Sequence, residues 1–165
     1  TDITPTVVPL VEELFSNSGL PAPSVEILEQ TPSSIPFGDS EFDFCLSNQV
    51  LYYLPNQSEI EKVTNEIYRT LKNNGLFFCT MMSRENYSIS HHSKLMKDDV
   101  FTVEMPSDHR LSGTSGYKEH IFVPRDEDHL TSLFPAFEPV TIGYFDQRMF
   151  DMHSNKHWIF VGRKK

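Results

Sequence analysis

The sequence lacks several features that mark particular classes of protein. Its longest apolar run, residues 76–82, includes Thr80 and is far too short to span a bilayer. It opens without a secretory signal pattern. It has only two cysteines, Cys45 and Cys79, and both fall on predicted central strands, which indicates small buried thiols and not a disulfide or metal framework. These absences favour a cytoplasmic protein with no metal site and no membrane partner.

The sequence also lacks a basic surface. Its 23 acidic and 14 basic residues give a formal net charge of −9. The only basic cluster is residues 163–165, at the tail, and a nucleic-acid surface needs a basic patch. Nucleic acid is therefore excluded as a partner. With 38% hydrophobic residues in 165, the composition predicts one soluble globular domain over residues 1–165.

The most informative stretch is residues 35–55. Residues 38–40, Gly-Asp-Ser, are typical of a turn. Phe42, Phe44 and Leu46 then alternate with other residues, which predicts a strand. Residues 47–49, Ser-Asn-Gln, follow where an open α/β sheet places its ligand-binding loops.

A helix and a second strand follow this stretch. Ser58 and Glu61 predict a capping box at the start of a helix over residues 59–72. Residues 74–75, Asn-Gly, supply a left-handed stop for that helix. The apolar run of residues 76–82 then predicts a strand covered on both faces of a parallel sheet.

The rest of the chain predicts further elements on either side. A helix should begin at Thr4 and Pro5 and end near residues 18–19, although Pro9 should kink it or delay its start. Residues 83–118 carry little periodicity and predict an irregular or partly helical cover on the substrate side. The remaining expected elements are short strands over residues 24–30 and 119–123, a helix after Pro124 with an acidic first turn, and a closing antiparallel pair over residues 140–144 and 157–162.

The stretch of residues 35–78 resembles the class I S-adenosylmethionine-dependent methyltransferases. The shared pattern is Pro-Phe, a short acidic turn, Phe-Asp and a strand, then a helix that ends in Leu-Lys-x-x-Gly before the next strand. The resemblance implies a Rossmann-like α/β sandwich with a mostly parallel sheet in the order 3-2-1-4-5-7-6 and a closing antiparallel pair. It also implies S-adenosylmethionine as cofactor and in-line transfer of a methyl group to a small molecule.

The resemblance implies three groups of cofactor-binding residues. Asp2, with Ile3 beside it, matches the acidic end of the second strand, where a carboxylate binds the ribose hydroxyls. Gln30 and Thr31 match the loop after the third strand, near the adenine, and Thr31 stands where the family usually has Asp. Ser47, Asn48 and Gln49 match the loop after the fourth strand.

One family feature is absent. None of the seven glycines forms the G-x-G turn that follows the family's first strand. Because that strand would lie in the middle of the sheet, we expect an N-terminally truncated domain, a different strand pairing, or a missing piece supplied by another chain, for example in a homodimer. The alternative function is a catalytically inactive methyltransferase-like binding or scaffold protein.

Catalytic residues are not identified by a motif. A general base helps when the acceptor is a hydroxyl or a protonated amine. The candidates in the substrate-side cover are Tyr87, His91, His92, His109 and His120. The alternative for each is a surface or core polar residue. Tyr52 and Tyr53 are expected to pack under the following helix and not to stack on the substrate.

Overall fold

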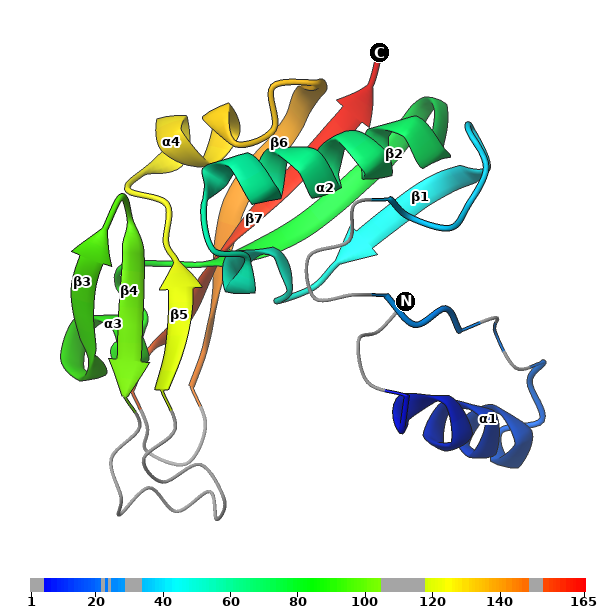
Figure 1. The fold of residues 1–165 in the computed structure, drawn as a ribbon, viewed down its shortest axis with the longest axis horizontal. Coiled ribbons are helices and arrows are strands. Elements are labelled where there is room, and N and C mark those ends of the chain that lie inside the picture. Colours follow the sequence, from blue (N-terminus) through cyan, green and yellow to red (C-terminus); the bar gives the residue numbers. More distant parts are fainter. Residues whose placement is uncertain (1–4, 22, 24, 29–33, 105–117, 149–152) are drawn as a thin grey trace.

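The computed structural model describes residues 5–21, 23, 25–28, 34–104, 118–148 and 153–165. Its main sheet has four strands in the order β1-β2-β7-β6 (Figure 1). β1 (Phe42–Ser47) is parallel to β2 (Leu71–Met82), and β2 is antiparallel to β7 (Asn155–Lys164), which pairs with β6 (Phe137–Gln147). This order matches the 4-5-7-6 half of the sheet that the resemblance implied, and the predicted closing antiparallel pair is confirmed.

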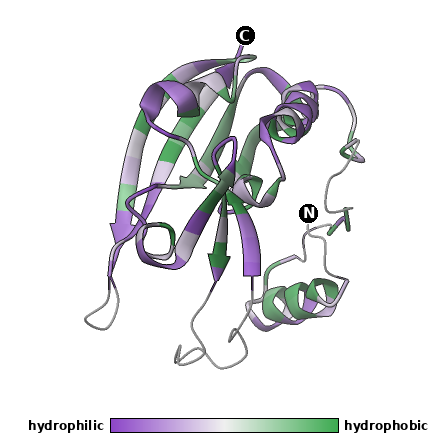
Figure 2. Cartoon of the chain, turned by 60° about the vertical axis from the view of Figure 1, so that its left-hand side comes forward, coloured by the Kyte–Doolittle hydropathy of each residue, from purple (hydrophilic) through white to green (hydrophobic). Residues whose placement is uncertain are grey.

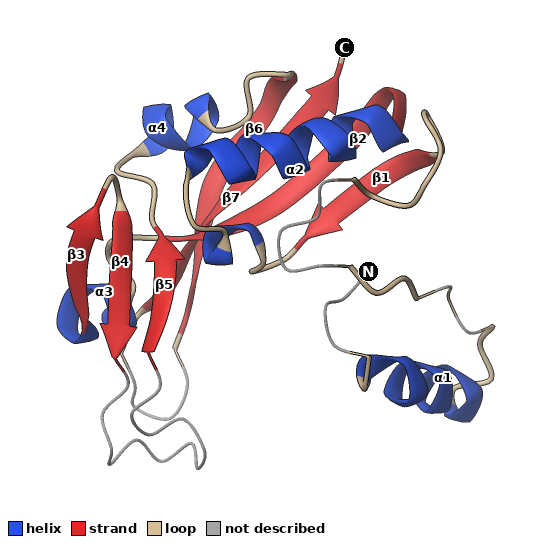
Figure 3. Ribbon diagram, viewed as in Figure 1, coloured by secondary structure: helices blue, strands red, loops and turns tan. Residues whose placement is uncertain are grey.

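Two helices lie over one face of the main sheet. They are α2 (Gln57–Thr70) and the shorter α4 (Glu127–Ser132), as Figure 3 shows. Ile60 and Ile67 of α2 are buried, together with Phe77 of β2. The Phe77 ring contacts a cluster of aromatic rings at centroid distances of 5.0–6.4 Å, from Phe134, Phe137 and Phe160. Burial of each such side chain stabilises the fold by about 1.5–3 kcal/mol, so this face forms the core.

The face of β1 that points away from α2 is open in the part of the chain that the structure describes. Phe44 and Leu46 alternate with Cys45 along the strand, and their side chains are 53% and 58% exposed. Among the described residues, no strand pairs with the outer edge of β1. Helix α1 (Val7–Asn17) buries none of its residues and lies apart from both sheets; it is largely green, and so hydrophobic, in Figure 2.

A second sheet stands at the carboxyl end of β2. It consists of the antiparallel strands β3 (Ser93–Lys97), β4 (Val100–Glu104) and β5 (Lys118–Phe122), and α3 (Tyr87–His92) leads into it (Figure 1). The prediction of an irregular cover over residues 83–118 is therefore wrong for β3 and β4. Asp98 and Asp99, with φ of 47° and 67°, form the two-residue left-handed turn of a hairpin.

Asp99 also ties this small sheet to the rest of the molecule. Its carboxylate accepts hydrogen bonds from Arg84 just after β2, at 2.5 Å, and from Arg125 just before α4, at 2.6 Å. Its backbone carbonyl accepts a hydrogen bond from Val123 at 2.9 Å. These bonds connect the hairpin to the ends of two elements of the main body.

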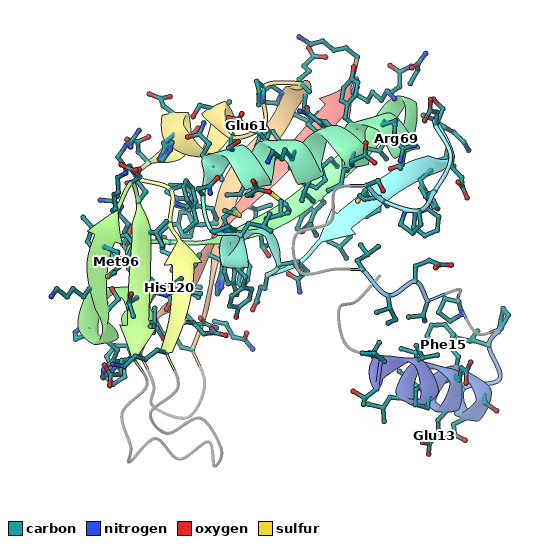
Figure 4. The ribbon with its side chains drawn as sticks, in the orientation of Figure 1. Glu13, Phe15, Glu61, Arg69, Met96 and His120 are labelled. Atoms are coloured by element: carbon teal, nitrogen blue, oxygen red, sulfur yellow. The ribbon has the colours of Figure 1, made fainter. Side chains whose placement is uncertain are left out.

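A polar network explains why the Pro-Phe turn and the end of α2 occur together in the sequence. The Arg69 guanidinium, labelled in Figure 4, donates to the carbonyls of Ile35 and Phe37, each at 2.9 Å. Glu66 accepts a hydrogen bond from the Ile35 backbone at 3.0 Å and pairs with Arg69, which lowers the pKa of Glu66. The last turn of α2 therefore holds the loop that precedes β1.

Both ends of α2 differ from the prediction. The N-cap is Asn56, whose side chain accepts from the Glu59 backbone at 3.0 Å, and not Ser58. The helix ends at Thr70, before Asn74, which has φ of +67° but lies within β2. Lys164 of β7 replaces the expected stop, because its buried ammonium donates to the carbonyls of Tyr68 and Leu71, each at 2.7 Å.

The predictions for the first 30 residues have mixed outcomes. α1 begins at Val7, later than predicted, so Pro9 lies in the first turn, where backbone N–H groups have no helical partner. The stop at Gly19 is confirmed by its φ of +66°. Of the strand predicted over residues 24–30, the structure describes 25–28, where only Ile27 takes part in a β-bridge. None of the described helices is long and apolar enough to cross a membrane.

Candidate functional site

The loop that leaves the carboxyl end of β1 is held in place by β2. Ser47 is buried, Asn48 is exposed, and Gln49 adopts a left-handed conformation with φ of +57°. The buried Thr80 hydroxyl accepts a hydrogen bond from the Gln49 backbone at 2.8 Å and donates one to the Asn48 side-chain oxygen at 3.0 Å. One hydroxyl therefore fixes both the loop backbone and the Asn48 amide at the edge where an α/β sheet binds its ligands.

The other predicted cofactor residues cannot be compared with this loop. Asp2, Ile3, Gln30 and Thr31 lie outside the described residues.

Three of the catalytic candidates gather around α3. The Tyr87 ring stacks on His91 at a centroid distance of 4.5 Å, and His92 meets its edge at 4.9 Å. A third partner of the Tyr87 ring is His153, which precedes β7 and stacks on it at 3.6 Å with the planes 7° apart. Tyr87, His91 and His153 line a cleft of about 300 Å³ together with Glu85, Ser90, Arg148 and Ser154.

The remaining candidates do not join this cleft. The His120 ring lies 3.1 Å from the Thr102 hydroxyl on the small sheet. His109 lies outside the described residues. In the described part of the chain, no three histidine, cysteine or carboxylate side chains are placed to hold a metal ion.

A buried histidine, which the sequence did not indicate, lies behind Tyr52. His157 is 1% exposed, its Nδ1 is 3.0 Å from the Asn155 carbonyl, and its ring stacks on Phe145 at 5.2 Å. Because a carbonyl can only accept, Nδ1 carries the proton and Nε2 is an acceptor. Nε2 has no hydrogen-bond partner among the described groups, and burial lowers the pKa of His157.

The two tyrosines next to the loop differ in exposure. Tyr52 and Tyr53 belong to the short 3-10 helix η1 (Leu51–Tyr53). Tyr52 is 2% exposed and lies 6.0 Å from the His157 ring of β7, so it is buried, and its packing under the following helix stays a prediction. Tyr53 is 41% exposed, so the packing prediction is wrong for this residue.

The two cysteines are not nucleophiles. Both thiols are free, and Cys79 is fully buried. Burial raises the pKa of Cys45 to about 11 and also raises the pKa of Cys79. Since the thiolate is the reactive form, neither residue offers it near neutral pH.

Comparisons with known proteins point to one family. A family model described as a methyltransferase domain matches residues 1–79. The sterol 4-C-methyltransferase strm-1 of Caenorhabditis elegans is 28% identical over 131 residues, which are 74% of this chain and 36% of that protein. The chain therefore spans about a third of the length of this relative.

Solved structures share the fold. A S-adenosylmethionine-dependent methyltransferase from Methanosarcina mazei has a TM-score of 0.69 at 18% identity, and the match covers 99% of this chain and 79% of that one. The N-methyltransferase NodS from Bradyrhizobium japonicum, solved with S-adenosyl-L-homocysteine, has a TM-score of 0.58 at 13% identity, covering 99% and 64% of the two chains. The family model covers 79 of the 165 residues, and the solved structures show that this chain has the fold of S-adenosylmethionine-dependent methyltransferases.

Proposed function

We propose that the protein is a S-adenosylmethionine-dependent methyltransferase that transfers a methyl group to a small-molecule acceptor by in-line displacement. The observation that carries the proposal is the loop of residues 47–49, which Thr80 holds at the carboxyl edge of a sheet with the methyltransferase strand order. This loop suits the cofactor, because the oriented Asn48 amide and the fixed backbone of Gln49 can bind the polar groups of S-adenosylmethionine.

The bound cofactor would supply an activated methyl group on a sulfonium that is already a leaving group. The protein then has to bind, orient and exclude water. In our proposal Ser47, Asn48 and Gln49 bind the cofactor at the end of β1, and Asp2, Ile3, Gln30 and Thr31 bind its ribose and adenine. Tyr87 and His91 remain candidates for taking a proton from the acceptor, since they line one cleft, and so does His92, whose ring lies against the edge of Tyr87.

We further propose that the acceptor is an apolar small molecule of the sterol class. The support is the relationship to the sterol 4-C-methyltransferase over 74% of this chain. The acidic composition, with a net charge of −9, disfavours a nucleic-acid acceptor. A cytoplasmic location and a homodimer belong to the same proposal.

A second function has a specific observation in its favour. The exposed edge of β1, with Phe44 and Leu46 open to solvent, is unusual for a strand next to a cofactor loop. A methyltransferase-like scaffold without a working cofactor pocket would tolerate such an edge.

Calorimetric titration with S-adenosylhomocysteine separates the two functions. The enzyme proposal expects one-to-one binding that Asn48→Ala weakens about tenfold, the equivalent of one lost hydrogen bond in a ligand site. Asn65→Ala, on an exposed position of α2, is the matched control and should bind as the wild type does. An absence of binding would favour the scaffold.

A further inference from the structure

The small sheet has a groove on its outer face. Val103 and Ile121 are buried in the core and define the inner face of the sheet. Lys94, Thr102 and His120 are partners in one row across β3, β4 and β5, and they alternate to the opposite, outer face. A groove of about 520 Å³ lies on that face, and its lining includes Lys94, Met96, Thr102, Glu104, Lys118 and His120.

The lining of this groove is rich in hydrogen-bond donors. The ammonium groups of Lys94 and Lys118 donate and cannot accept. The Thr102 hydroxyl lies 3.1 Å from His120 Nδ1. That pair holds at least two protons and uses one in the bond between them, so one donor remains available to a ligand. Glu104 can only accept, and its carboxylate is 3.2 Å from the Lys118 ammonium, so its charge is already paired. The groove therefore offers donors in excess of acceptors.

The charge of the groove is opposite to the charge of the whole chain. The chain has 23 acidic and 14 basic residues, whereas two ammonium groups and one carboxylate belong to the described lining of the groove. A hollow with positive charge in excess attracts anions. Met96 of β3, which Figure 4 labels together with His120 of β5, is 60% exposed and brings an apolar side chain to the same groove. The lining therefore suits a molecule that joins an anionic group to a hydrocarbon chain.

We propose that this groove binds a small amphiphilic anion, whose oxyanion group, such as a carboxylate, is held by Lys94, Lys118 and the Thr102–His120 pair. A carboxylate has two oxygens that only accept, so it matches a lining that mainly donates, and hydrogen bonds between charged groups are the stronger kind. The hydrocarbon chain contacts Met96. A neutral or cationic molecule with the same chain lacks the matching charge. This groove is separate from the loop after β1, so the inference goes beyond the proposed function and does not depend on it.

The test is NMR titration of the full chain with sodium octanoate, followed through the backbone amides of β3, β4 and β5. 1-Octanol and octyltrimethylammonium are the matched probes, which have the same hydrocarbon chain and carry no charge or the opposite charge. We expect octanoate to shift the amides of these strands in a saturable way. It should bind at least about fivefold more tightly than either matched probe, because only octanoate can pair with the lysines.

Lysine variants test which charges hold the anion. Lys94→Gln and Lys118→Gln should each weaken octanoate binding about threefold, as expected for one partly exposed ion pair, and Lys94→Arg should keep the wild-type affinity. Lys97→Gln is the matched control, since it removes the same charge from the same strand at a position outside the described lining of the groove. This variant should bind octanoate as the wild type does.

Four results would each overturn the inference. They are no saturable binding of octanoate, binding that leaves the amides of the small sheet unshifted, equal affinity for octanoate and 1-octanol, and a Lys97→Gln variant weakened as much as Lys94→Gln. Vesicles of phosphatidylglycerol are a further probe. Binding to these vesicles without saturable binding of octanoate would assign the positive charge to contact with a membrane surface, and would overturn the inference as well.

Discussion

The Thr80→Val substitution tests the architecture of the cofactor loop most closely. Valine has nearly the same shape as threonine and suits a strand, so the change removes a hydroxyl and little else. In the wild type that hydroxyl is buried, accepts from the Gln49 backbone at 2.8 Å and donates to Asn48 at 3.0 Å. The variant therefore leaves two polar groups of the loop without their partner.

The two groups contribute unequally. Asn48 is exposed, so its side-chain oxygen can bond to water and its loss costs little. The Gln49 N–H is half-buried behind the loop, and a buried donor left without a partner costs about 1–3 kcal/mol. We expect Thr80→Val to lower the free energy of unfolding by about 1–2 kcal/mol, and to weaken binding of S-adenosylhomocysteine because the loop is no longer fixed.

Urea denaturation followed by circular dichroism measures the first effect. The matched control is Thr64→Val in α2, because Thr64 is equally buried but donates only to the carbonyls of Ile60 and Glu61 within its own helix. That change should cost under about 0.5 kcal/mol, since such bonds to carbonyls of the preceding turn add little to a helix. If Thr80→Val were no more destabilising than Thr64→Val, the reasoning about the loop would be refuted.

Three further predictions concern the small sheet, the histidines and the thiols. Asp99→Asn removes the charge that pairs with Arg84 and Arg125, so it should destabilise the protein and speed amide exchange in β3 and β4. The cost should be only about 1 kcal/mol, because both arginines are partly exposed. Asp98→Asn on the same turn is the control and should change neither quantity. Burial lowers the pKa of His157 and His129, so the unfolded state binds more protons than the folded state at mildly acidic pH. The free energy of unfolding should therefore fall as the pH drops below about 6.5. His157→Gln should make this dependence shallower in urea titrations from about pH 8 to 5. Cys45, with a pKa of about 11, should resist Ellman's reagent at pH 8 in the folded protein and react fully in urea; rapid reaction of the folded protein would contradict its burial.

The main sheet could be predicted because its strands leave a local trace in the sequence. The alternation of Phe42, Phe44 and Leu46 and the apolar run of residues 76–82 correspond to β1 and β2. The closing pair was also visible, as two alternating segments with a polar connection. The run in β2 records burial directly, because Phe77, Cys79 and Met81 are fully buried, whereas the alternation in β1 records the strand period on a face that is open to solvent.

The small sheet could not be predicted in the same way. β3 has one half-buried residue and four exposed ones, so its side chains do not alternate clearly. β5 pairs with β4, and the paired residues are 14 positions apart at Glu104 and Lys118 and 22 apart at Val100 and Phe122, a distance at which pairing has no local signal. The pair Asp98 and Asp99 is the local signal of this hairpin, because aspartate tolerates the left-handed conformation that the turn requires.

The predicted ends of α2 were wrong for a related reason. Asn56 and Ser58 both suit an N-cap, and the capping-box pattern favoured Ser58, but the backbone makes its bend at Asn56. The end of α2 is set by Lys164, which is 94 positions beyond Thr70 and whose ammonium takes the last carbonyls of the helix. A residue so distant in the sequence is invisible to any local rule.

The candidate site likewise contains residues that the local sequence predicts and residues that only the tertiary fold brings in. Asn48 and Gln49 followed from the position of a loop after a strand, whereas His153 reaches Tyr87, and His157 reaches Tyr52, only through the tertiary fold. His157 stood in an apolar strand and gave no separate signal. In the sequence, Thr80, which fixes the loop, is distinguished only as an interruption in an apolar run.

The most direct test of the central claim is calorimetric titration of this chain with S-adenosylhomocysteine, alongside Asn48→Ala. The account predicts one-to-one binding by the wild type and binding about tenfold weaker by the variant, with Asn65→Ala unchanged. A wild type that binds no S-adenosylhomocysteine, or binds it with an affinity that Asn48→Ala does not alter, would contradict the claim that the loop after β1 is a methyltransferase cofactor site.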